Sequence, residues 1–88
     1  MDARIFIETC HGRLVEDVAS FAQASEAVRK VTDDPVRPVG SSDFYSAIIV
    51  DNSTGRQLAV VSYNGRVWNR KVPMDEWVRG VRAVELTD

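Results

Sequence analysis

Several residue types are scarce in this 88-residue chain, and each scarcity excludes a class of protein. With Cys10 as the single cysteine, no disulfide can form within the chain, and a reducing compartment, the cytoplasm, is expected. His11 is the single histidine, which leaves a histidine-rich metal centre without its ligands. No apolar run approaches the roughly 18 residues of a membrane-spanning helix. The start of the chain, where Glu8 follows three apolar residues, is not typical of a signal peptide.

Motifs that carry chemistry are equally few. Cys10 and His11 could pair as nucleophile and base, but adjacent side chains on a strand diverge, and no third residue orients the histidine. The Gly40-Ser41-Ser42 segment lacks the second glycine and the lysine of a phosphate-binding loop. We therefore predict no catalytic residue, no metal site and no cofactor. A small enzyme or toxin that uses Cys10 is kept as an alternative.

Charge is nearly balanced overall but unevenly distributed. The net charge is −2, with −4 over residues 1–54 and +2 over residues 55–88. A dedicated nucleic-acid-binding domain is usually strongly basic, because phosphate neutralisation supplies most of its affinity. The balance therefore favours a protein partner, and the acidic half could face a basic partner surface. A nucleic-acid-binding regulator that uses the basic final third is the alternative.

Composition indicates one globular domain, residues 1–88. Hydrophobic residues make up 44% and charged residues 27%, which is ordinary for a soluble globular protein. Two domains would each be too short to build a core. The segment 32–43 contains Pro35, Pro38 and Gly40, and is interpreted as a long connection within the domain.

Periodicity and turn signals predict an α+β fold. An amphipathic helix over 21–32 begins after Ser20, which lies three residues before Gln23, as in a capping box. Strands are expected at 5–7, 13–18, 44–50, 57–63 and 66–70, of which 13–18 could instead start the helix and 44–50 is expected to be central. Asn64-Gly65 predicts a type I′ hairpin turn. The tail is either a helix near 74–79 or a closing strand over 81–86.

The expected architecture is an antiparallel sheet of four to six strands with one main helix packed on one face. A single helix covers one side of such a sheet. The other face must then be shielded by the tail, by a second copy of the chain or by a partner.

Aromatic and basic residues gather in the last third of the chain. Aromatic side chains interleaved with arginine are typical of the residues that dominate binding energy in protein interfaces. Trp68 and Trp77 could instead fill the core. The predicted partner-binding residues, with an acidic pair as a further contact, are Tyr63, Arg66, Trp68, Arg70, Lys71, Asp33 and Asp34.

The order of elements also resembles a known class of small proteins. The helix with Ala24, Ala27 and Val31 is followed by Ile48-Ile49-Val50, Thr54-Gly55, Leu58-Ala59-Val60, Asn64-Gly65 and Trp68. This arrangement is similar to small phage-encoded inhibitors, and more specifically to anti-CRISPR proteins that block type I surveillance complexes. The resemblance covers a little over half of the chain. It implies a non-enzymatic protein that binds a Cas subunit in the cytoplasm of a bacterial host and blocks recruitment of target DNA.

Overall fold

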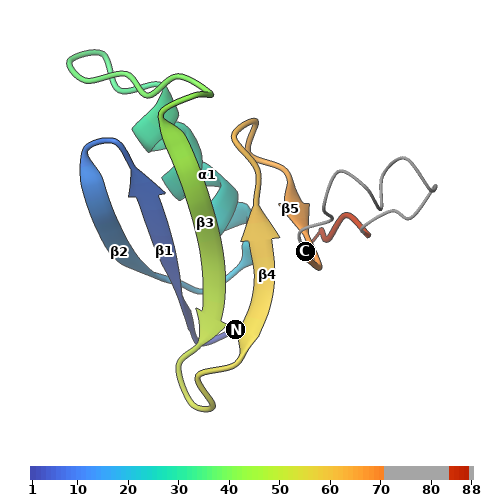
Figure 1. Cartoon of the computed structure of the whole chain (residues 1–88). Coiled ribbons are helices and arrows are strands. Elements are labelled where there is room, and N and C mark those ends of the chain that lie inside the picture. Colours follow the sequence, from blue (N-terminus) through green and yellow to red (C-terminus); the bar gives the residue numbers. More distant parts are fainter. Residues whose placement is uncertain (71–83, 88) are drawn as a thin grey trace.

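The computed structural model describes residues 1–70 and 84–87, which form one sheet and one helix. In chain order the elements are β1 (Ala3–Thr9), β2 (Gly12–Val18), α1 (Phe21–Thr32), β3 (Phe44–Asp51), β4 (Gln57–Val61) and β5 (Val67–Trp68). The antiparallel strands lie in the order β2-β1-β3-β4-β5 (Figure 1). This confirms the predicted α+β fold and the central position of β3.

The core lies between α1 and one face of the sheet. Alternate residues of β1 and β3 point toward the helix, and Ile5, Ile7 and Ile49 are fully buried there. Ala24 and Val28, one helical turn apart, supply the facing surface of α1. The period of two in the strands and the helical spacing in α1 therefore direct their apolar residues into one shared layer.

The helix begins and ends where the sequence indicates. The Ser20 hydroxyl accepts a hydrogen bond from the backbone N–H of Gln23 at 3.1 Å. In return, Gln23 Oε1 accepts from the N–H of Ala19 at 2.7 Å, one residue before the position that a capping box predicts. At the other end, the N–H of Asp33 donates to the carbonyl of Arg29 at 2.8 Å. Both ends of α1 thus satisfy some of their exposed backbone groups.

The prediction of a type I′ turn at Asn64-Gly65 was wrong. Gly65 has φ of 85°, but no non-glycine residue in the described part of the chain has a positive φ, so Asn64 does not. The N–H of Gly65 donates to Ser62 O and that of Ser62 donates to Arg66 O, both at 2.9 Å. These bonds define a three-residue loop with a type I turn followed by a glycine bulge. Asn64 Oδ1 stabilises it by accepting from the Arg66 N–H at 3.2 Å.

The strands on either side of this loop are shorter than predicted. β4 ends at Val61 instead of residue 63, and β5 spans two residues instead of the predicted five. The alternative prediction, a closing strand over 81–86, is confirmed in part. Trp68 forms a bridge with Glu85, and the Leu86 N–H donates to the Val67 carbonyl at 2.8 Å. The predicted helix near 74–79, together with Lys71 and Trp77, lies outside the described residues.

Candidate functional site

The candidate site is the face of the sheet opposite α1, here called the open face. Figure 1 views the molecule from this side, and no described helix lies over it. Strand register aligns one apolar residue from each strand, because Phe6 pairs with both Val15 and Ile48, and Val60 pairs with both Ile48 and Trp68. These five residues form a continuous line across the sheet, called the apolar row.

The apolar row is accessible along its length. Val15, on the edge strand β2, exposes 43% of its surface. Phe6, Ile48, Val60 and Trp68 are half-buried, whereas their neighbours that point toward α1 are buried. A contiguous apolar patch on an otherwise polar surface is a common mark of a protein-binding site.

A charged pair borders the row on the side of the β1–β2 turn. Glu8 and Arg13 are register partners, and Arg13 Nε donates to Glu8 Oε1 at 3.0 Å. The same guanidinium lies 6.0 Å from the ring centroid of Phe6. Arg13 therefore connects the polar border to the apolar row through a cation–π contact. This pair is called the first flank.

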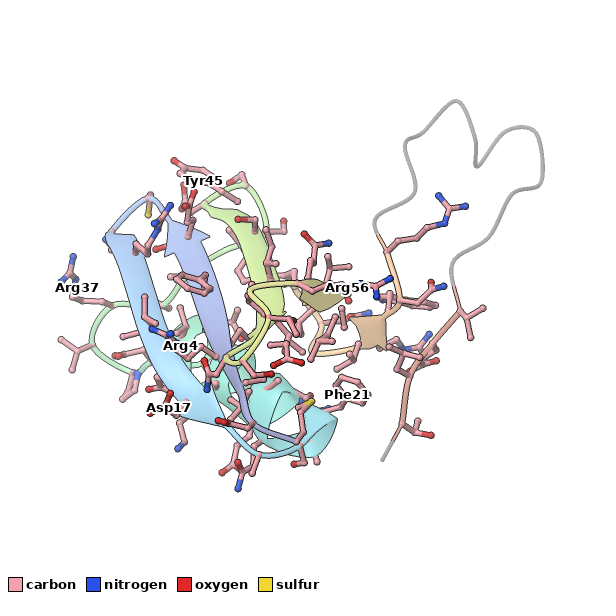
Figure 2. All side chains as sticks on the ribbon, turned by 90° about the horizontal axis from the view of Figure 1, so that it is seen from below. Arg4, Asp17, Phe21, Arg37, Tyr45 and Arg56 are labelled. Carbon is pink, nitrogen blue, oxygen red and sulfur yellow. The ribbon has the colours of Figure 1, made fainter. Side chains whose placement is uncertain are left out.

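A second charged pair borders the row on its other side. Arg4 and Asp17 are register partners on neighbouring strands (Figure 2). Arg4 Nε donates to Asn52 Oδ1 at 2.6 Å, and Asn52 in turn donates to Asp2 Oδ1 at 2.7 Å. Arg4 and Asp17 are called the second flank. With an apolar centre and polar margins, the open face has the layout of a protein–protein interface.

A cavity of about 300 Å³ opens on the same face. Phe6, Ile48 and Val50 contribute apolar walls, and Glu8 and Arg13 contribute polar ones. The cavity lies beside the centre of the apolar row, so a partner could insert an apolar side chain there.

Of the predicted binding residues, Trp68 lies on the open face. It ends the apolar row, and its indole Nε1 donates to the Ser62 hydroxyl at 3.3 Å. Trp68 therefore does not lie in the core under α1, which was the alternative prediction for this residue.

Tyr63 and Arg66 lie in and beside the β4–β5 loop, and both are exposed. The Tyr63 ring packs edge-to-face on Phe44, with centroids 6.0 Å apart, rather than on Trp68. Arg66 Nε lies 4.0 Å from Glu85 Oε1. Arg70 is exposed just after β5. The aromatic and basic set thus surrounds the β5 end of the sheet without forming one continuous surface.

The acidic pair lies elsewhere. Asp34 Oδ1 accepts from the N–H groups of Arg37 at 3.0 Å and Val36 at 2.8 Å, and these bonds lower the pKa of the Asp34 carboxyl. Asp34 and Arg37 line a cavity with Leu14 of β2, the edge strand farthest from β5, and Figure 2 shows Arg37 beyond that strand. Asp33 and Asp34 therefore do not join Trp68 in one site.

Sequence reasoning missed the other four residues of the apolar row, Val15, Phe6, Ile48 and Val60. Each alternates with residues of opposite orientation along its strand, and this period of two is the signal that the sequence contains. Their alignment into a row depends on the pairing register, which connects residues more than forty positions apart.

Groups that could support other functions are sparse in the part of the chain that the structure describes. Residues 1–70 and 84–87 hold no cluster of three potential metal ligands. None of the helical structure in these ranges has the length and apolar character needed to cross a membrane. Cys10 is exposed in the turn between β1 and β2.

Comparison with models of protein families, with curated proteins and with solved structures finds no match for this chain.

Proposed function

We propose that this chain is a non-enzymatic binding protein that uses the open face to occupy the surface of another protein. The apolar row carries the proposal, because it crosses all five strands and stays accessible between two charged flanks. A typical interface buries about 800 Å² on each partner. That is about a seventh of the total accessible surface of 5766 Å², an area that one face of a sheet can provide.

We further propose that the target is a Cas subunit of a type I surveillance complex. The similarity in size and element order to phage-encoded inhibitors supports this choice, as does the net charge of −4 over residues 1–54, which suits a basic partner. Occupation of a subunit surface that receives DNA would block recruitment of the target without any chemical step.

The test is binding to a purified type I surveillance complex immobilised on a sensor. We expect wild-type protein to bind at micromolar concentration or below, and Val15→Asp to weaken binding by about tenfold or more, because it places a charge in the apolar row. Val36→Asp is the matched control: Val36 is 84% exposed in the loop after α1, so the same substitution there leaves the open face unchanged. Circular dichroism checks that both variants are folded.

Two outcomes would refute parts of the proposal. If wild-type protein does not associate with the complex at micromolar concentration, the Cas target is wrong. If Val15→Asp and Val36→Asp bind equally well, the open face is not the binding surface.

A further inference from the structure

The charges on β2 and β1 follow an order that makes this half of the open face complementary to itself. From β2 to β1, the first flank has Arg13 and then Glu8, positive before negative. The second flank has Asp17 and then Arg4, negative before positive. Arg13 and Asp17 lie two residues on either side of Val15, so the flanks are at equal distances from the apolar row, about 7 Å along the strand.

We propose that a second copy of this chain docks on the open face, with a two-fold axis along the apolar row. The proposal rests on the proposed function, because a second copy and the Cas subunit would use the same open face and would therefore compete for it. In such a dimer each residue of the row meets its own counterpart, and two sheets pack face to face with both helices outside. Isologous contacts of this kind are the commonest basis of homodimers.

Rotation about the row exchanges the two flanks and brings opposite charges together. Arg13 faces Asp17 of the second copy, and Glu8 faces Arg4 of the second copy. Symmetry repeats each contact, so the dimer gains four ion pairs between chains. Packed sheets lie about 10 Å apart, a distance that arginine and carboxylate side chains can bridge together.

The alternative axis, parallel to the strands, is disfavoured by the same charges. It would place β2 over β5 of the second copy, so that Arg13 would approach Arg66, which precedes Trp68 by two residues. Both side chains are cationic, and like charges in an interface reduce affinity. The four flank residues of β2 and β1 therefore favour the axis along the row, which sets each of them against an opposite charge.

The dimer leaves part of the predicted binding set accessible. The Tyr63 ring packs on Phe44, at the margin of the core, and not on the apolar row. The two copies of Tyr63 would thus stay outside the interface, where they could contact a further protein. A five-stranded face is close to the lower size limit of specific interfaces, so we expect a dissociation constant in the micromolar range.

The test is the solution mass of the full chain by analytical ultracentrifugation across a micromolar concentration series. We expect the mass to rise from 9.8 kDa to twice that value. Arg13→Asp and Asp17→Arg should each weaken the dimer by about tenfold or more, because each creates two like-charge contacts across the axis. Arg37→Asp, an exposed loop substitution with the same charge change as Arg13→Asp, should leave the dimer intact.

Mixing the two variants provides the decisive measurement. In a heterodimer, Asp at position 13 of one chain faces Arg at position 17 of the other, and the native Arg13 of that other chain faces the native Asp17. We therefore expect the two weakened variants to associate one to one when mixed. The double variant Arg13→Asp/Asp17→Arg should again form a homodimer. Both results require the proposed axis, and non-specific association through the apolar row would not produce them.

Three outcomes would overturn the inference. The wild-type chain could stay monomeric throughout the series, Arg13→Asp and Asp17→Arg could both leave the dissociation constant of the dimer unchanged, or the two variants could fail to associate on mixing. The proposed function is tested separately. A monomeric wild type that still binds the Cas complex through Val15 would refute the dimer and support the binding protein. A dimer that behaves as expected but fails to bind the complex would support the inference and remove the Cas target.

Discussion

At the scale of single residues, Gly65 has two constraints that the other described glycines do not combine. Its φ of 85° lies in the left-handed region, and a Cβ at this position would come within 2.8 Å of Arg29 Nε and 3.1 Å of Ser25 Oγ. The Ser25 hydroxyl also donates to the Gly65 carbonyl at 2.6 Å. The β4–β5 loop is thus held directly against α1.

We expect Gly65→Ala to lower the free energy of unfolding by about 2 kcal/mol, through backbone strain and displacement of the Arg29 side chain. Gly55→Ala, with φ of 74° but open space around the Cβ, should cost about 1 kcal/mol. Gly40→Ala, with neither constraint, should stay within about 0.5 kcal/mol of wild type. Urea denaturation measures all three, and equal effects would contradict this ranking.

The carboxylates of Asp34 and Asp51 make the stability of the protein depend on pH. Backbone N–H groups of Arg37 and Val36 lower the pKa of Asp34 from its ordinary value of 3.8, and the backbone and hydroxyl of Ser53 lower the pKa of Asp51. The unfolded chain therefore binds protons more readily than the folded one in acid. Their stabilising contribution is complete above the unfolded-state pKa and is lost as the pH falls through the lowered folded-state values.

We expect Asp34→Asn/Asp51→Asn to be less stable than wild type at neutral pH, because the amide oxygens accept the same hydrogen bonds without charge. The difference should shrink as the pH falls below 3.8, where the wild-type carboxyls also become neutral. Urea midpoints at a series of pH values measure this. A difference that stays constant into strong acid would show that the charges do not act as described.

At the scale of elements, the cap of α1 can be tested directly. We expect Ser20→Ala to lower the free energy of unfolding by about 1 kcal/mol, because the Gln23 N–H loses its acceptor. Ser41→Ala, in the exposed loop before β3, is the matched control and should change stability by less than about 0.5 kcal/mol. Thermal unfolding of both variants measures the difference, and similar melting temperatures would mean that the cap contributes little.

The two faces of β3 should differ in their contribution to stability. Ile49 is fully buried under α1, whereas its neighbour Ile48 is half-buried in the apolar row. We expect Ile49→Ala to cost about 3 kcal/mol, since it removes buried surface and leaves a cavity, and Ile48→Ala to cost about half as much. Denaturation at dilute protein concentration measures both. A larger cost for Ile48→Ala would show that the open face is part of the folding core.

At the scale of the whole molecule, α1 and the sheet of the described residues enclose a single core. The buried residues of all five strands and of α1 belong to one cluster, which argues for a single cooperative unit. We expect one calorimetric transition, with an enthalpy near 60 kcal/mol for a chain of this length. Differential scanning calorimetry checks this, and two separable transitions would contradict the assignment of a single domain.

Much of the architecture was predictable from local signals. Ser20 and Pro35 bracket an amphipathic segment, and the predicted strands at 44–50 and 57–63 are bounded by turn-forming residues, so α1, β3 and most of β4 were recognised. The type of turn at Asn64 was not, because a three-residue and a two-residue loop can both contain Asn-Gly. The choice depends on bonds between Ser62 and Arg66 that the neighbouring strands impose.

The candidate site could be predicted only in part from such local signals. Period-two alternation, a local property of each strand, already indicated which side chains share a side of their own strand. Whether Phe6 meets Val15 and Ile48, and whether Trp68 continues the same line, depends on register and strand order, since these contacts join distant parts of the chain. The hydrophobic effect requires apolar surface to be buried but does not specify its neighbour. Backbone pairing across the sheet supplies that information, and it turns scattered apolar residues into one surface between ordered charges.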